Sequence, residues 1–117
     1  MDNEKVTSKF TCSGNKGFTM GFNNGLVISV QWGSMNYCDR RSINADLRSE
    51  MKQELVQSET AEIAIWDADS NWFNFGYDEV KGWCTANEVA DWIAAVSTAK
   101  DLTELHSIAT ERQYIGI

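Results

Sequence analysis

The chain has 117 residues, of which 43% are apolar, and a formal net charge of −7. This length and apolar content predict one packed domain over residues 1–117 and exclude a disordered chain. The sequence has no apolar run long enough to span a bilayer, so no membrane partner is expected. Three cysteines without a Cys-x-x-Cys pair, and an N-terminus without an apolar leader, predict reduced thiols in a cytoplasm.

The first predicted elements are a short strand and a β-hairpin. Residues 1–9 are polar and are expected to fray, and Phe10-Thr11-Cys12 predicts a strand. Two alternating apolar runs then flank Asn23-Asn24-Gly25, a pattern typical of a hairpin over residues 17–32. A two-residue turn would place apolar side chains opposite polar ones across the two strands. A three-residue loop instead puts the large apolar residues on one face. The predicted pairs are Phe18–Val30, Met20–Ile28 and Phe22–Leu26, with Gly25 in the left-handed region.

From Asn44 the periodicity changes to that of a helix. Leu47, Met51 and Leu55 recur every four residues, which predicts a helix over residues 44–57 that is capped by Asn44. The apolar stripe is thin, so a charged surface loop is the alternative for this segment.

A second hairpin is predicted from residues 60–66 and 72–75. Ile63 and Ile65 share one face of the first strand, and Phe73 and Phe75 share one face of the second. Pairing these faces leaves a loop over residues 67–71 and brings Trp66 opposite Trp72 on the other face. That tryptophan pair then either packs beneath another element or forms an exposed platform.

Helices are predicted at the C-terminal end. Thr85 and Glu88 have the spacing of a capping box, and an apolar stripe that includes Trp92 continues to about Ala99. Asp101 can cap one further short helical turn, and residues 114–117 form a terminal strand or tuck against the core. The sequence therefore predicts an α+β domain, with an antiparallel sheet of four to five strands built from two hairpins and packed by a C-terminal helix.

Sites for metals and catalysis are not supported by the motifs. Residues 67–71 alternate acids and amides like half of a calcium loop, but Trp72 stands where that loop needs glycine, so a hairpin turn is favoured. Three cysteines and one histidine are enough residues for a Cys₃His zinc site, but their spacings match no known ligand pattern. Three buried core thiols and a solvated histidine are therefore favoured. These four residues are Cys12, Cys38, Cys84 and His106. We expect no enzyme activity, no metal and no cofactor.

The charge excess lies in one segment. Between Glu59 and Asp91 there are eight acids and only Lys81 as a base, while the rest of the chain is balanced. Acidity disfavours direct binding to duplex nucleic acid and favours a protein with a basic surface. Tryptophans in the same segment suit anchoring at an interface, although acidity alone also maintains solubility. The predicted interface residues are Trp66, Asp67, Asp69, Trp72, Asp78, Glu79 and Trp83.

A second candidate site surrounds the densest basic spot. Arg40 and Arg41 could hold a phosphate while Trp32 or Tyr37 stacks on a base, which would make a nucleotide site. The simpler interpretation is an exposed charged loop, in which the arginines pair with Asp39 or with the acidic segment.

Several segments together resemble a group of small phage and prophage proteins without assigned activity. These segments are Phe22–Gly25, Ser29–Gly33, Tyr37-Cys38, Thr60–Asp67 and Val80–Trp83. The resemblance implies an accessory protein that acts in the host cytoplasm, and such proteins resemble inhibitors of host defence in size and acidity. Three hypotheses follow: an inhibitor of a host defence or nucleic-acid-handling protein, a sponge for a nucleotide immune signal, and a virion structural or assembly component. A symmetric homo-oligomer would suit the sponge.

Overall fold

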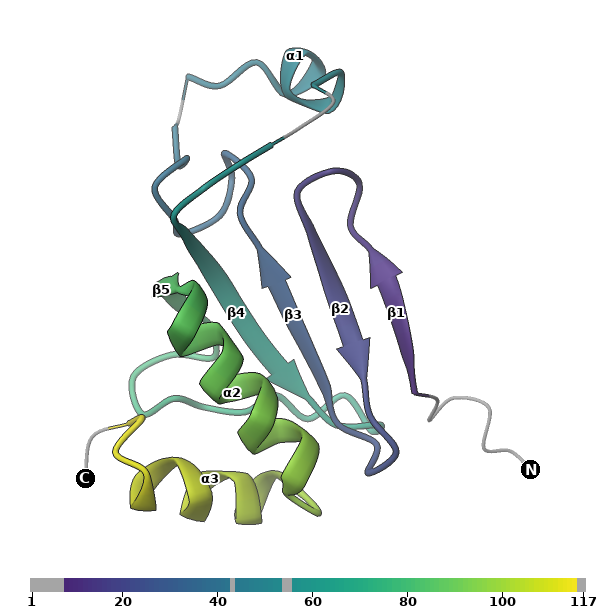
Figure 1. The fold of residues 1–117 in the computed structure, drawn as a ribbon, viewed down its shortest axis with the longest axis vertical. Coiled ribbons are helices and arrows are strands. Elements are labelled where there is room, and N and C mark those ends of the chain that lie inside the picture. Colours follow the sequence, from purple (N-terminus) through teal and green to yellow (C-terminus); the bar gives the residue numbers. More distant parts are fainter. Residues whose placement is uncertain (1–7, 43, 54–55, 116–117) are drawn as a thin grey trace.

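The computed structural model describes residues 8–42, 44–53 and 56–115 of the chain. Within these residues five strands form one antiparallel sheet, in the order of the sequence (Figure 1). The strands are β1 (Lys9–Cys12), β2 (Gly17–Gly21), β3 (Val27–Gln31), β4 (Thr60–Trp66) and β5 (Lys81–Thr85). The helices are α1 (Leu47–Met51), α2 (Ala86–Thr98) and α3 (Leu102–Glu111). The α+β class with a five-stranded sheet and C-terminal helices is confirmed.

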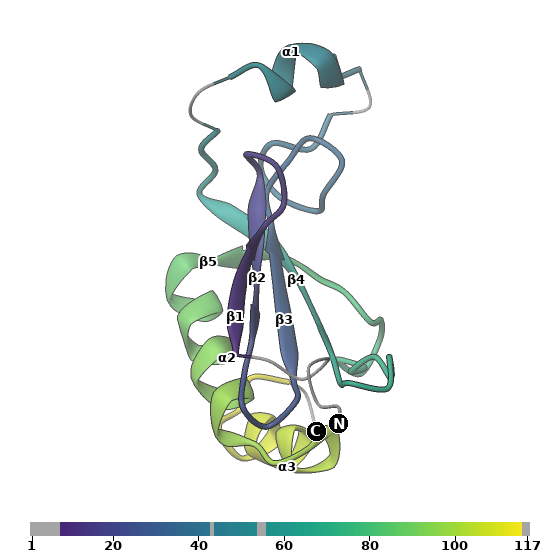
Figure 2. The same cartoon turned by 90° about the vertical axis from the view of Figure 1, so that its right-hand side faces the viewer.

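The sheet has two different faces. The helix face contains Ile28, Ile63 and Ile65, and α2 covers it by packing on β3, β4 and β5. The outer face contains the alternate residues of the same strands, including Ala64 and Trp66. Figure 2 shows the sheet edge-on, with α2 on one side and the connection between β4 and β5 on the other.

The first hairpin has the predicted register. Phe18 lies opposite Val30 and Met20 opposite Ile28, and the loop closes with the Phe22 amide donating to the Leu26 carbonyl at 2.9 Å. Gly25 has a φ of +89°, as the left-handed position of this loop requires. β1 is also confirmed and begins at Lys9; the expected fraying of residues 1–9 otherwise falls mostly on residues outside the described ranges.

The hairpin loop is joined to the end of α2 by one side chain. The Asn24 amide Nδ2 donates to the carbonyl of Val96 at 2.7 Å and also to the carbonyl of Ala99. Carbonyls at a helix C-terminus have no partner within the helix, so the asparagine satisfies them. This contact fixes α2 across the helix face.

The second hairpin is predicted correctly only at its turn. Trp66 and Trp72 form a bridge, and the Phe73 amide donates to the Ile65 carbonyl at 2.8 Å. The predicted strand over residues 72–75 is wrong beyond this bridge, because β5 occupies the rest of that edge of β4. Phe73 and Phe75 are still buried in the core, so their apolar pattern reflects burial and not strand pairing.

The predicted helix over residues 44–57 is much shorter in the structure. α1 spans five residues, and its N-cap is Asp46 instead of Asn44. Leu47 and Met51 are exposed, and Leu55 lies outside the described residues. The buried member of α1 is Glu50, which the apolar periodicity could not indicate.

The C-terminal helices follow their capping signals. Thr85 and Glu88 form the predicted capping box, and α2 ends at Thr98 with Ala99 as its C-cap. Asp101 caps α3, which is longer than the single turn predicted. Tyr114 and Ile115 tuck against the core without forming a strand; residues 116–117 lie outside the described ranges.

Trp92 fills the centre of the core between α2 and the sheet. Its side chain is 2% exposed. Its ring centroid lies 5.0 Å from that of Phe75, 5.8 Å from that of Phe73 and 5.5 Å from that of Tyr114. The contacts with Phe73 and Phe75 are edge-to-face, and such contacts add to the free energy gained from burial.

We expect Trp92→Ala to lower the free energy of unfolding by about 3–5 kcal/mol, because it leaves a large cavity. Urea unfolding followed by circular dichroism measures the change. Trp72→Ala is the matched control and should cost only about 1 kcal/mol, since that ring is half exposed and stacks on one partner. Equal losses in the two variants would contradict this description of the core.

Candidate interaction surface

The first part of the surface is the pair Trp66 and Trp72. Their ring centroids are 5.1 Å apart with an interplanar angle of 33°. Trp66 lies on the outer face by strand alternation, and the bridge brings Trp72 beside it. Trp72 is 45% exposed, so the pair is an accessible platform and is not covered by α1.

Asp67 shapes the loop that follows this pair. Its carboxylate accepts hydrogen bonds from the backbone amides of Asp69 and Asn71, both at 2.9 Å, and from Asn71 Nδ2 at 3.0 Å. Partial burial raises the pKa of Asp67, but these hydrogen bonds outweigh it and hold the pKa below its ordinary value. The turn interpretation of residues 67–71 is confirmed. Within the described ranges, no three His, Cys, Asp or Glu side chains converge on a metal position.

The second part of the surface is the pair Tyr37 and Trp83. Their ring centroids are 5.7 Å apart, and the Trp83 amide donates to the Tyr37 carbonyl at 2.8 Å. Trp83 has a φ of +51°, a left-handed conformation that is strained for a bulky side chain. A register shift between β4 and β5 at this point produces the irregular backbone. Trp83 is nevertheless 53% exposed, so the strain does not serve burial of its ring.

The two aromatic pairs lie on the same side of the sheet. The Tyr37 amide donates to the carboxylate of Glu62, which shares the outer face with Trp66. Glu62 and Trp66 are four residues apart on β4, or about 13 Å along an extended strand. The surface therefore presents two aromatic pairs at about one strand length from each other.

Three further acidic side chains are exposed in the same part of the chain as Trp72 and Trp83. Asp69, Asp78 and Glu79 are exposed in the connection between β4 and β5, which lies on the outer-face side (Figure 2). We call the set formed by the two pairs, Asp67 and these three acids the acidic aromatic surface. Its members are Tyr37, Trp66, Asp67, Asp69, Trp72, Asp78, Glu79 and Trp83. Sequence reasoning found all of them as interface residues except Tyr37, which it placed at the nucleotide site.

The four residues of the predicted nucleotide site are not gathered into one pocket. Trp32 lies on the helix face, where its indole Nε1 donates to the Val56 carbonyl at 2.8 Å. Arg41 lies over the Tyr37 ring, with its guanidinium carbon 4.5 Å from the ring centroid. Arg40 pairs with Glu50 at 2.8 Å, and not with Asp39 or the acidic segment. Binding of a nucleotide stays a prediction, and the geometry adds nothing to it.

Glu50 anchors the segment that carries Tyr37. Its side chain is 4% exposed and accepts hydrogen bonds from the Ser34 amide and hydroxyl, both at 3.0 Å, and from Arg40. Burial raises its pKa, but the hydrogen bonds from Arg40 and Ser34 outweigh it and lower the pKa below 4.5. The sequence signal was only the charged stretch around Glu50, which gave no reason to expect burial.

The cysteines and the histidine do not form a site. Cys38 and Cys84 are buried, as predicted, but Cys12 is exposed. The prediction of three core thiols is wrong for Cys12, because it lies on the edge strand β1, while α2 packs mainly on β3, β4 and β5. His106 is exposed on α3, as predicted.

Comparisons with protein-family models, with curated proteins and with solved structures find no match to this chain. In the part of the chain that the structure describes, no helix has the length and apolarity required to cross a membrane. The functional argument therefore rests on the geometry and charge of the chain itself.

The Glu50 contact makes stability depend on pH. The folded-state pKa lies below the ordinary value of 4.5, so the carboxylate stabilises the fold above that pH and loses its contribution as the pH falls through the folded-state pKa. We expect Glu50→Gln to cost about 2–3 kcal/mol near neutral pH, and progressively less as the pH falls below 4.5 and through the folded-state pKa. Urea unfolding near neutral pH and below pH 4.5 measures the difference. Glu111→Gln, at an exposed site, is the control. Its difference from the wild type in free energy of unfolding should be the same in both pH ranges.

The close approach of Gly82 to Tyr37 can be tested by adding one methyl group. A Cβ at residue 82 would lie 2.5 Å from the Tyr37 Cβ and 2.9 Å from its carbonyl oxygen. We expect Gly82→Ala to cost roughly 1–3 kcal/mol and to open the stack of Tyr37 on Trp83. Loss of the ring-current shifts of the Tyr37 ring protons in NMR spectra reports the opening. Tyr37→Phe is the control: it keeps the stack on Trp83, so the ring protons at residue 37 should keep their ring-current shifts. If Gly82→Ala leaves these shifts unchanged, the close approach of Gly82 to Tyr37 is refuted.

Proposed function

We propose that this chain is a non-enzymatic binding protein whose acidic aromatic surface engages a basic surface of a partner protein. The observation that supports this most is the exposed, backbone-strained Trp83, stacked on Tyr37. Strain in the backbone is tolerated where it serves a function, and exposed tryptophans are typical anchors of interfaces. Trp72 supplies a second anchor on the same side of the sheet.

The charges give the surface its preference for a partner. The exposed acids around the aromatic pairs would steer a basic protein into place and repel nucleic acid. Asp67 has a different role from its neighbours, since its carboxylate is engaged by the turn amides. Steering is therefore assigned to Asp69, Asp78 and Glu79.

The resemblance to phage and prophage proteins narrows the proposal. It suggests a host defence or nucleic-acid-handling protein as the target, in the host cytoplasm, with stoichiometric inhibition as the effect. A nucleic-acid-handling protein has a basic surface by necessity, which agrees with the charge of the proposed site. The sponge and the virion component remain the alternative hypotheses, and no feature of the described residues favours either.

The test is an affinity purification from a bacterial lysate with three immobilised baits. The wild type should retain a basic protein that Trp72→Ala with Trp83→Ala releases, because each anchor is expected to contribute at least about 2 kcal/mol. The third bait is Phe10→Ala, which removes an exposed aromatic ring from β1 and should retain the same protein. Mass spectrometry of the eluates identifies what differs.

Binding kinetics then separate the roles of charge and aromatic area. Asp69→Asn with Glu79→Gln should slow association, and raised salt should remove the difference from the wild type. The tryptophan variant should mainly speed dissociation. A partner whose binding ignores salt, these acids and both tryptophans would refute the proposal.

A further inference from the structure

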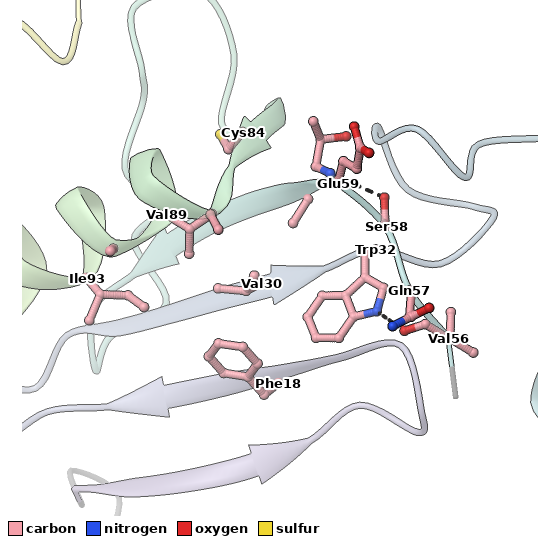
Figure 3. Close-up of a pocket in the computed structure, with 14 residues that line it drawn as sticks. Phe18, Val30, Trp32, Val56, Gln57, Ser58, Glu59, Cys84, Val89 and Ile93 are labelled. Carbon is pink, nitrogen blue, oxygen red and sulfur yellow. Dashed lines mark hydrogen bonds between the residues drawn. The ribbon is translucent and has the colours of Figure 1, made fainter. Parts of the chain in front are cut away.

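A pocket opens on the helix face, away from the acidic aromatic surface. It has a volume of about 430 Å³, within the range of roughly 300–1,000 Å³ that is typical of small-molecule sites. Phe18 and Trp32 line one side, and the first half of α2 lines the other (Figure 3). The segment over residues 56–60 forms the rim.

Small side chains keep this space open. Ala86 and Ala90 present only methyl groups from α2, and Ala61 does the same from β4. α2 packs mainly on β3, β4 and β5, so the Phe18 ring on β2 lies to one side of the helix, across the pocket from it. Trp32 cannot swing into the space without losing the hydrogen bond from its indole Nε1 to Val56 (Figure 3). The pocket is thus a persistent feature of the packing.

The lining is apolar inside and polar only at the rim. Val30, Cys84 and Val89 form a buried floor, while Ser58 and Thr60 lie at the mouth. Burial raises the pKa of the Cys84 thiol to about 11, so it stays neutral and acts as an apolar atom rather than a nucleophile. This arrangement suits noncovalent binding of a molecule with an apolar body and a polar end.

The charge of the rim selects among such molecules. Among the described residues that line the pocket, Glu59 is the only one with a formal charge. The adjacent N-terminus of α2 offers little to an anion, because Glu88 and Thr85 satisfy each other's backbone amides in the capping box. The net charge of −7 repels anions further.

We propose that this pocket binds a neutral or cationic amphipathic small molecule, with its aromatic or aliphatic body between Trp32 and α2 and its polar end at Glu59. This ligand site is separate from the proposed protein interface and does not depend on it. The same charge disfavours fatty acids, nucleotides and other anions as ligands.

Two dyes with the same aromatic body test the proposal. N-phenyl-1-naphthylamine is neutral, and 8-anilinonaphthalene-1-sulfonate adds one negative charge. The neutral dye should bind the full chain with enhanced fluorescence, at least about threefold more tightly than the anionic dye, as expected for one exposed charge near Glu59. Glu59→Gln should reduce the ratio of the two affinities by about threefold and leave the affinity for the neutral dye unchanged.

Variants on α2 test the position of the site. Ala90→Phe places a ring in the pocket without removing a buried contact. It should lower the affinity for the neutral dye at least about tenfold. Ala94→Phe, one turn further along at an exposed position that does not line the pocket, is the matched control and should bind like the wild type. Circular dichroism checks that both variants fold.

NMR spectra identify the surface that the dye occupies. The indole N–H signal of Trp32 should shift on titration, while those of Trp72 and Trp83 on the other side of the sheet should not. No binding of the neutral dye, equal binding by Ala90→Phe, or shifts confined to Trp72 and Trp83 would overturn the pocket. Equal affinity for the two dyes would overturn its charge preference. Each of these results leaves the test of the acidic aromatic surface unaffected.

Discussion

Packing of α2 on the helix face of β3 and β4 is the constraint on which the rest of the structure depends. Trp92 occupies the space between the helix and the sheet, and Ile28 and Ile65 are fully buried beneath it. Because strand residues alternate between faces, this burial commits every other residue of β4 to the outer face. Glu62 and Trp66 are therefore placed on one side of the sheet by a core to which they contribute nothing.

The elements that could be predicted are those specified by local chemistry. The 23–25 loop follows from apolar parity and the glycine, the start of α2 follows from its capping box, and its end follows from the extent of the apolar stripe. The strand over 72–75 failed because Phe73 and Phe75 satisfy the same apolar pattern as a strand or as buried loop residues. β5 was missed because its register shift at Gly82 and Trp83 breaks the alternation by which a strand is found.

The candidate site was predicted in composition but not in arrangement. The pairing of Trp66 with Trp72 follows from hairpin register, which short-range sequence determines. The stack of Tyr37 on Trp83 joins residues 46 positions apart and depends on the missing Cβ of Gly82. The Glu50 contact with Arg40 and Ser34 depends likewise on the path of an irregular segment. Neither contact leaves a periodic signal in the sequence.

The two faces of the sheet meet different physical demands, and this explains why both proposed sites can exist in so small a domain. The outer face has irregular segments on it, which hold aromatic rings at the surface by backbone hydrogen bonds such as that from Trp83 to Tyr37. The helix face has one helix over three of its five strands, so part of its apolar surface stays accessible beside Phe18. Four side chains of α2 line that opening, and two of them, Ala86 and Ala90, are only methyl groups at exposed positions. An apolar opening lined by small side chains leaves room for a ligand, and this is the physical basis of the proposed pocket.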